Sequence, residues 1–520
     1  MDNDKYDDIR RGCRFNESTT ARQQDVKRVE YPKQQFVLVN LGNLPIRYVE
    51  IAVRGGIIGT TTAYFLTRHP SFNPSIHHIT LLEAATIAAG ASGKAGGLLA
   101  LWAYPMCIVP LSYRLHAELA GEHGGAERWG YRRLGCGQLA ATVKTKDPKT
   151  KLNGSRRSKL KNERRRKSSS NIGAGTIPSQ QQQQQNGQSP IQNGPGQQLE
   201  HDPQPQQNGY GQKEWQKLPK QDEAASSVLH ESLLPADLDW INSDMVGEYA
   251  EMGLPGYIET AQVHPLQFTT AMAELARSGG TETRTNAQVT KIGLNASETA
   301  VRSVEYTDRV CGETRTIHGV TDVVLAAGPW TGRLLPRSRV EGVRAHSVVF
   351  AAEVSPYAVF TNITLPANFL PAHRAARGER RRRHKSNVDP EIYARPGREV
   401  YACGELDPAA PLPETADQVE CDESQCDDLV AYIGTVSRVL GAATVAAKQA
   451  CYMPRHMRPG QESTPLVGGT CVDGLWVAAG HTCWGIQNGP ATGKLMSEFI
   501  FEGAARSADA SELDPRQFKI

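Results

Sequence analysis

Long hydrophobic runs, paired cysteines and import signals are all missing from this sequence of 520 residues. It contains no run of about 18 apolar residues, the length that suggests a membrane-spanning helix. The start, Met1 to Lys5, lacks the apolar segment of a signal peptide, and the last three residues differ from the peroxisomal S-K-L signal. The ten cysteines form no C-x-x-C pair and no short disulfide framework. These absences predict a cytoplasmic protein with reduced thiols and no metal site.

The basic charge of the sequence is confined to one stretch. The formal charge of the chain is +3, but residues 144–167 carry twelve Lys or Arg and two acidic residues. Without this stretch the net charge would be −7, so the composition does not indicate a nucleic-acid-binding protein. Apolar residues make up 39% of the chain, which allows a large core and about two or three domains.

Composition divides the chain into a tail, two folded parts and an insertion between them. Residues 1–46 are largely polar, charged and aperiodic. Residues 143–225 contain the basic stretch, six consecutive glutamines and many Asn, Gly and Pro. This insertion is predicted to be disordered because it can bury little apolar area. The folded parts are therefore expected at 47–142 and from 226 onward.

Several helices and strands are predicted in the second folded part. Apolar spacing predicts a helix at Phe268–Ala276, and the alanine-rich stretch Leu429–Gln449 is also expected to be helical. Leu475–Ala479 is expected to be a strand that leads into a glycine-rich turn and a final helix. The segment His373–Lys385 is interpreted as a basic, solvated surface loop. Further strands are expected at Ala287–Ile292, Ala300–Tyr306, Asp322–Ala327 and Ser347–Phe350.

One segment of the first folded part has the pattern of a dinucleotide-binding turn. Residues 48–83 combine a strand, closely spaced glycines, a helix and a second strand that ends in Glu83. Gly56 would let the backbone approach a phosphate, and Glu83 would bind ribose hydroxyls. Arg54 stands where the first glycine of G-x-G-x-x-G belongs, so a glycine-rich turn without a ligand is the alternative. Replacing Arg54 with glycine is expected to improve nucleotide retention.

Three further segments rich in small residues are consistent with a bound nucleotide. Residues 90–100 would let the backbone and Ser92 lie against phosphate, although a flexible surface loop is the alternative. Residues 323–331 form an apolar strand that ends in small residues, where ligands bind in α/β proteins. Residues 474–494 predict a strand, a turn and a helix whose N–H groups would suit the carbonyl of a reduced flavin.

With these segments in this order, the chain resembles the FAD-dependent oxidoreductases of the D-amino-acid-oxidase superfamily. It looks most like a fungal branch that includes a yeast protein associated with late endosomes. The resemblance implies an α/β (α+β) fold, with an FAD/NAD(P)-binding Rossmann-like domain and a β-sheet substrate domain that are discontinuous in sequence. It is carried by Gly56-Ile-Ile-Gly, by residues 91–105, 116–133 and 262–265, by Ala326 to Gly332, and by Gly480-His481 with the following helix.

The resemblance also implies where the domains and the cofactor contacts lie. The FAD-binding domain would consist of residues 47–142, 226–335 and 466–520, and the substrate domain of residues 336–465 with elements from 226–335. Val289 would meet the adenine through its backbone. The residues expected to bind FAD are Gly55, Gly56, Ile57, Ile58, Gly59, Glu83, Ala84, Ser92, Ala95, Gly96, Gly97, Leu98, Val289, Ala326, Ala327, Gly328, Trp330, Gly480, His481, Gly485 and Ile486.

The activity that the resemblance implies is oxidation of an amine or amino acid. A C–H bond beside the nitrogen would deliver hydride to flavin N5, the imine would hydrolyse, and oxygen or another acceptor would reoxidise the flavin. Family members hold the substrate carboxylate with an arginine, which makes Arg455 and Arg458 candidates, with surface arginines as the alternative. Tyr104 and Tyr401 are candidate pocket walls. His481 is either a catalytic group or a hydrogen-bonded structural histidine.

Two other functions are compatible with the sequence. The chain is alternatively a flavin-fold protein that has lost catalysis and acts as a trafficking or interaction factor at endosomes, with the glutamine-rich insertion as a binding arm. An NAD(P)-dependent dehydrogenase is a third class, which the segment after Gly480 disfavours. A cytoplasmic protein with endosomal association is therefore expected, with a small-molecule substrate and no nucleic-acid partner.

Overall fold

The computed structural model describes residues 47–51, 55–144, 234–253, 258–380 and 384–520. The predicted tail, the predicted insertion except for residues 143 and 144, and Arg54 lie outside these ranges, so the hypotheses about them stay predictions. The described residues belong to one contact unit, Ile46–Ile520. Within the described part of the chain, no helix has both the length and the apolarity needed to cross a membrane. The predicted domain boundaries also stay predictions.

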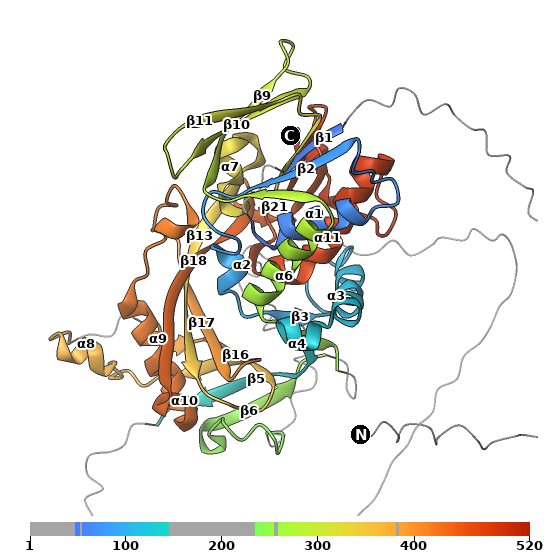
Figure 1. The fold of residues 1–520 in the computed structure, drawn as a ribbon. Helices are drawn as coiled ribbons and strands as arrows, with labels where there is room; N and C mark the ends of the chain where they lie inside the picture. Colours follow the sequence, from blue (N-terminus) through green and yellow to red (C-terminus); the bar gives the residue numbers. More distant parts are fainter. Residues whose placement is uncertain (1–46, 52–54, 145–233, 254–257, 381–383) are drawn as a thin grey trace, which may run out of the picture. The chain divides into compact units, whose positions relative to one another are not determined.

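A six-stranded sheet forms the first half of the described fold (Figure 1). Five of its strands are parallel neighbours, and the edge strand β20 runs antiparallel to β21. The predicted Rossmann-like arrangement is confirmed, because parallel strands with helical connections are its defining feature. The strands, in sheet order, are β20 (Leu466–Gly469), β21 (Leu475–Ala479), β12 (Asp322–Leu325), β1 (Arg47–Ile51), β2 (His77–Leu82) and β8 (Thr281–Arg284).

Helices cover one face of this sheet and a small sheet covers the other. Val324 and Ala478 pack in the cluster formed with the helices, whereas Val323, Leu325 and Val477 pack in the opposite cluster. This packing on both faces explains why β12 and β21 are apolar at nearly every position. In Figure 1, α1 lies beside α6 and α11, and α11 also contacts α3. The helices are α1 (Ile57–Arg68), α3 (Val109–His123), α6 (Pro265–Ser278) and α11 (Gly485–Glu502), and the small sheet contains β9 (Ala287–Leu294), β10 (Val301–Asp308) and β11 (Thr314–His318).

A nine-stranded mixed sheet forms the second half of the described fold. Most neighbours are antiparallel, but β5 and β14 run parallel. One face packs against α9 and α10, and the other contributes Val349, Phe360 and Tyr401 to a separate cluster with Trp484. The elements are β19 (Gln461–Ser463), β18 (Thr444–Arg458), β13 (Val340–Ala351), β17 (Glu399–Asp407), β16 (Glu391–Arg395), β14 (Tyr357–Thr364), β15 (Asn387–Val388), β5 (Gly135–Thr142), β6 (Val246–Glu251), α9 (Glu423–Val436) and α10 (Arg438–Ala442).

Short elements connect these parts. One of them is a three-stranded sheet, whose strand β3 directly follows the glycine-rich segment at residues 90–97. Its strands are β3 (Leu98–Ala100), β7 (Thr260–Gln262) and β4 (Arg132–Arg133), and the short helices are α2 (Ala91–Lys94), α4 (Gly125–Trp129), α7 (Thr331–Leu334) and α8 (Ala372–Ala376). The predicted helix at Phe268–Ala276 and the predicted strands at 287–292, 300–306, 322–327 and 347–350 all fall on elements of the matching type.

The prediction of one helix over Leu429–Gln449 is wrong at its C-terminal end and in expecting a single helix. The helices α9 and α10 end at Ala442, and β18 begins at Thr444. This strand pairs with β13 from Val340 to Ala351. Alanine favours helix by only fractions of a kcal/mol per residue, so pairing along a long strand overrides that preference.

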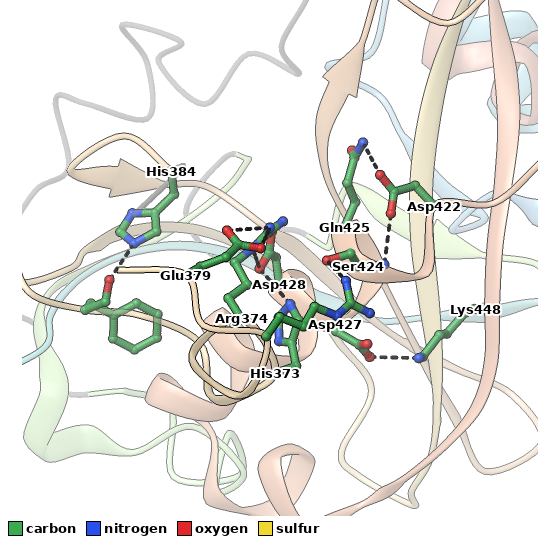
Figure 2. Close-up of polar contacts among 12 residues, drawn as sticks. His373, Arg374, Glu379, His384, Asp422, Ser424, Gln425, Asp427, Asp428 and Lys448 are labelled. Atoms are coloured by element: carbon green, nitrogen blue, oxygen red, sulfur yellow. Dashed lines mark hydrogen bonds and ion pairs between the residues drawn. The ribbon is translucent and has the colours of Figure 1, made fainter. Parts of the chain in front are cut away.

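The segment predicted as a solvated basic loop is partly buried. Arg374 in α8 is only 6% exposed, and its Nε donates to Asp428 Oδ1 at 2.7 Å. Glu379 lies 3.2 Å from the same guanidinium, and His373 Nε2 lies 3.2 Å from Asp428 (Figure 2). These contacts attach α8 to α9, so Arg374 is a structural ion-pair partner. The prediction was wrong here because an arginine-rich composition does not show which guanidinium meets a buried acid.

Candidate functional site

A cavity of about 430 Å³, called the main cavity below, lies between the two large sheets. Its lining comes from the residues that follow β2, β12 and β21, and from strands of the nine-stranded sheet. Ligands bind at this carboxyl edge in open parallel sheets. Seventeen of the residues predicted to bind FAD line it: Gly56, Ile57, Ile58, Glu83, Ser92, Ala95, Gly96, Gly97, Leu98, Ala326, Ala327, Gly328, Trp330, Gly480, His481, Gly485 and Ile486.

A second cavity, the side cavity, has a volume of about 210 Å³ and shares Ala327 and Trp330 with the main cavity. Ala84 and Val289, both predicted to bind FAD, line it. The two remaining predicted residues, Gly55 and Gly59, line neither cavity. A Cβ on Gly55 would meet Ile87 Cδ1 at 2.3 Å, which explains the glycine by packing.

The N-terminal end of α1 opens into the main cavity. The N-cap residue of α1 is Gly56, which has no side chain to form a capping hydrogen bond, and the first turn of α1 contains no acidic residue. The Ile57 N–H donates to Ser92 Oγ at 2.9 Å. Glu83 is 2% exposed and accepts hydrogen bonds from the N–H groups of Gly55 and Ala85. A helix start and a buried acid therefore flank the glycine turn, the arrangement that binds a dinucleotide.

Two glycines after α2 leave room that side chains would fill. A Cβ on Gly96 would lie 2.2 Å from the ring of Tyr393. Gly97 has φ of 84°, and a Cβ there would lie 2.0 Å from the carbonyl oxygen of Val263. Because L side chains rarely adopt this φ, position 97 requires glycine. The small residues of this segment are thus explained by close backbone approach at the cavity wall.

The N-terminal end of α11 is held by α3, through residues to which sequence reasoning assigned no role. Pro490 lies inside α11 and has no N–H, so the carbonyl of Ile486 loses its usual helical donor. The Nε2 of His116 lies 3.0 Å from that carbonyl oxygen and donates to it. Ser112 Oγ donates to the Gln487 carbonyl at 2.6 Å and accepts from the N–H of residue 491 at 3.1 Å. Pro490, a proline within a predicted helix, was the sequence feature that could have indicated this need for outside hydrogen-bond donors.

His481 is buried in the cavity wall as a neutral imidazole. Its Nε2 lies 3.0 Å from Thr492 Oγ1, and its Nδ1 has no hydrogen-bond partner among the described residues. Burial lowers the pKa of His481 from 6.5 to about 3. The preceding Gly480 has φ of 84°, which positions the turn into α11. At neutral pH, His481 can donate or accept a hydrogen bond but carries no charge.

The two candidate arginines lie in different surroundings. Four residues of β18 line the main cavity: Cys451, Met453 and Arg455, which share one face of the strand, and Pro454 between them. Arg458 is three positions further along, and its guanidinium carbon lies 4.0 Å from the centroid of the Phe518 ring. Of the two candidate arginines, Arg455 therefore lines the main cavity and Arg458 does not.

Aromatic rings form another part of the cavity wall. Tyr401 and Tyr393 both line the cavity and stack with centroids 5.9 Å apart. Burial raises the pKa of both phenols well above 10, so both stay neutral. Tyr104 does not line the cavity, but its hydroxyl lies 2.9 Å from the cavity residue Thr482 at Oγ1. Tyr393 was missed from sequence because the position of β16 within the sheet depends on long-range pairing.

Glu462 is a second cavity residue that sequence reasoning missed. It lies in β19, is 6% exposed, and lines the main cavity. Burial raises the pKa of Glu462 from 4.5 to about 7, despite the opposing attraction of Arg455. A single glutamate in a polar stretch carries no sequence signal, because its burial depends on the pairing of β19 with β18.

The sequence of the chain matches a protein-family model and two fungal proteins. A family model described as FAD dependent oxidoreductase (DAO) matches residues 55–184 and 197–499. The Saccharomyces cerevisiae protein named "Putative oxidoreductase TDA3" is 34% identical over 517 residues, which cover 90% of this chain and 94% of that protein. The Schizosaccharomyces pombe protein C1F5.03c, described in the same words, is 29% identical over 478 residues, covering 89% and 97%.

Solved structures share the fold at low sequence identity. Glycine oxidase from Bacillus cereus has a TM-score of 0.56 and 16% identity, and the match covers 90% of this chain and 98% of that one. L-proline dehydrogenase from P. horikoshii has a TM-score of 0.57 and 14% identity, with coverage of 92% and 99%. At these identities the likeness shows the fold alone.

Proposed function

The chain belongs to the FAD-dependent oxidoreductase family, and from this premise we propose that it binds FAD across the two cavities and oxidises an amine or amino acid. The observation that carries the proposal is the meeting of three features in the main cavity. They are the start of α1, whose N-cap residue is a glycine, the glycines that remove side chains from the wall, and the buried Glu83. Each suits one part of a dinucleotide.

The residues of the two cavities are suited to hold the parts of FAD in order. The N–H groups at the start of α1, with Ser92, would bind the pyrophosphate. Glu83 would bind ribose hydroxyls, and the side cavity beside Val289 would take the adenine. The turn from Gly480 into α11 would lie against the flavin ring, where a helix N-terminus favours negative charge. The shared walls at residues 327 and 330 support one elongated ligand.

When bound, FAD would supply the acceptor for a hydride from the substrate carbon atom that lies beside the nitrogen. The residues of the chain would bind and orient the substrate. Arg455 would hold a carboxylate, while Tyr393, Tyr401 and the buried Trp484 exclude water from the cavity wall. Neutral His481 would supply a hydrogen bond and no charge. The names of the fold relatives refer to glycine and L-proline, which supports an amino-acid substrate class.

Purification of the full chain tests the proposal. The protein is expected to be yellow, to show the visible absorbance of oxidised flavin, and to release FAD on denaturation. Glu83→Gln should weaken FAD binding by about tenfold or more, because a hydrogen bond to a charged group is lost. Glu248→Gln, at an exposed position on β6, is the matched control and should bind FAD normally. Colourless protein that stays free of FAD after its addition would contradict the proposal and favour the non-catalytic alternative.

A further inference from the structure

Glu462 is a buried acid of the main cavity that lacks hydrogen bonds. Among the described residues, it is the one acidic side chain whose two oxygens are both buried without a hydrogen-bond partner. By contrast, Glu83 accepts from the N–H groups of Gly55 and Ala85, and Glu391 accepts from the hydroxyl of Tyr393. Buried polar groups are nearly always paired, so an unpaired carboxyl in a cavity wall indicates a partner that arrives from solution.

The surroundings of Glu462 define the charge of that partner. The strand register pairs Glu462 with Met457, which places it near the cavity-facing Arg455. The Nε of Arg455 is also buried without a hydrogen-bond partner. Glu462 also interacts electrostatically with Tyr104 and Cys483, and burial raises the pKa of both, which keeps them neutral. The cavity thus presents one unpaired acid and one guanidinium with an open donor.

We propose that Glu462 binds the ammonium group of the substrate and accepts one of its protons, while Arg455 faces the substrate carboxylate. The inference rests on the proposed function and assigns the substrate class as a cationic amine, preferably a zwitterionic amino acid. An N–H bond of the ammonium breaks and an O–H bond forms on the carboxylate, so two opposite charges become two neutral groups. The nitrogen lone pair is then free before the C–H bond is broken, and no other reactant is needed.

This assignment explains both unusual properties of Glu462. Its free oxygens are the acceptors that an ammonium group requires. Its raised pKa places the carboxyl in the range where it takes and releases a proton near neutrality. A neutral alcohol or a simple carboxylic acid would leave the carboxyl without a cationic partner. The pair of Glu462 and Arg455 therefore selects for amines.

Calorimetric binding to the full-length protein tests the proposal with three probes. Benzylamine is the cation, glycine the zwitterion and propionate the anion. Each is titrated at about pH 6 and about pH 8, on either side of the pKa of about 7, in two buffers that differ in ionisation enthalpy. The variants are Glu462→Gln and the exposed control Glu248→Gln. Visible absorbance of the same samples records flavin content separately.

The wild-type protein and the control should bind both amines about tenfold more tightly at the higher pH, and release close to one proton on binding at the lower pH. In Glu462→Gln the proton release should vanish and amine affinity should fall by about tenfold or more, with propionate binding unchanged or stronger. The proposal is overturned if Glu462→Gln binds amines as the wild type does, if propionate weakens equally, or if the wild type binds neither amine. A colourless protein would count against the proposed FAD function, whereas the proton count would still decide the role of Glu462.

Discussion

At the residue scale, the ionisation of Glu462 has a measurable consequence for stability. Its pKa is 4.5 when solvated and about 7 in the fold, so between these values the folded state binds more protons than the unfolded state. The free energy of unfolding should therefore decrease as the pH rises from 4.5 to 7. Glu462→Gln is expected to remove this decrease and to be more stable than the wild type at about pH 8, by roughly 2 to 3 kcal/mol.

Urea unfolding of the two proteins at about pH 5 and about pH 8 measures this difference. The stability gap between variant and wild type should be small at the lower pH and large at the higher pH. Glu248→Gln, on the exposed surface of β6, should show no such gap. Equal pH dependence in all three proteins would show that Glu462 ionises as a solvated carboxyl does.

The neighbouring arginines show what the sequence could predict at this scale. The resemblance identified the segment that contains Arg455 and Arg458, but it could not separate them. Their separation follows from the alternation of β18, and only the first residues of β18, Thr444 to Gln449, were predicted as part of a helix. Local alanine content favoured helix, whereas pairing with a distant strand fixed the structure. Glu462 was beyond prediction because its burial depends on the pairing of β19 with β18.

At the element scale, the contact of α3 with α11 should matter for stability and for cofactor retention. His116→Ala removes the donor to the Ile486 carbonyl, which Pro490 leaves without its helical partner. A buried carbonyl without a donor is unfavourable, and the lost ring adds a packing defect against Phe268. Thermal and urea unfolding should show a loss of on the order of 2 to 3 kcal/mol.

The start of α11 lines the main cavity, so FAD affinity should also fall in His116→Ala. His318→Ala is the control because His318 is exposed on β11, and it should change neither quantity. An unchanged stability of His116→Ala would mean that α11 keeps its geometry at Pro490 without support from α3.

The attachment of α8 to α9 gives a second prediction at the element scale. Arg374→Met leaves Asp428 and Glu379 without their shared guanidinium in a buried setting, which should destabilise the fold by about 3 kcal/mol. Arg438→Met is the matched control, because its pair with Asp244 is largely exposed and should contribute less than about 1 kcal/mol. Denaturant midpoints of the two variants measure the contrast. Equal midpoints would show that the ion pair of Figure 2 does not fix α8.

At the scale of the whole molecule, much of the half that contains the six-stranded sheet could be predicted, because its sequence motifs are local. Glycines at strand ends and apolar strands at regular positions identified the segments at 48–83, 90–97, 326–328 and 480–489 without knowledge of the fold. The structure brings residues from all four to the main cavity. The cavity wall that the nine-stranded sheet forms could not be predicted residue by residue. That sheet depends on strand pairings such as that of β5 with β14, which are more than 200 positions apart in the sequence.

The central claim is that this chain carries FAD and uses it to oxidise amines. The most direct measurement is the visible absorbance of the purified protein during anaerobic titration with a panel of amino acids and simple amines, alongside alcohols and carboxylic acids of matched size. We predict that at least one amine bleaches the oxidised flavin band, that no matched alcohol or acid does so, and that air or an added acceptor restores the band. A protein without flavin, or a flavin that stays oxidised with every amine but is reduced by a matched alcohol, would contradict it.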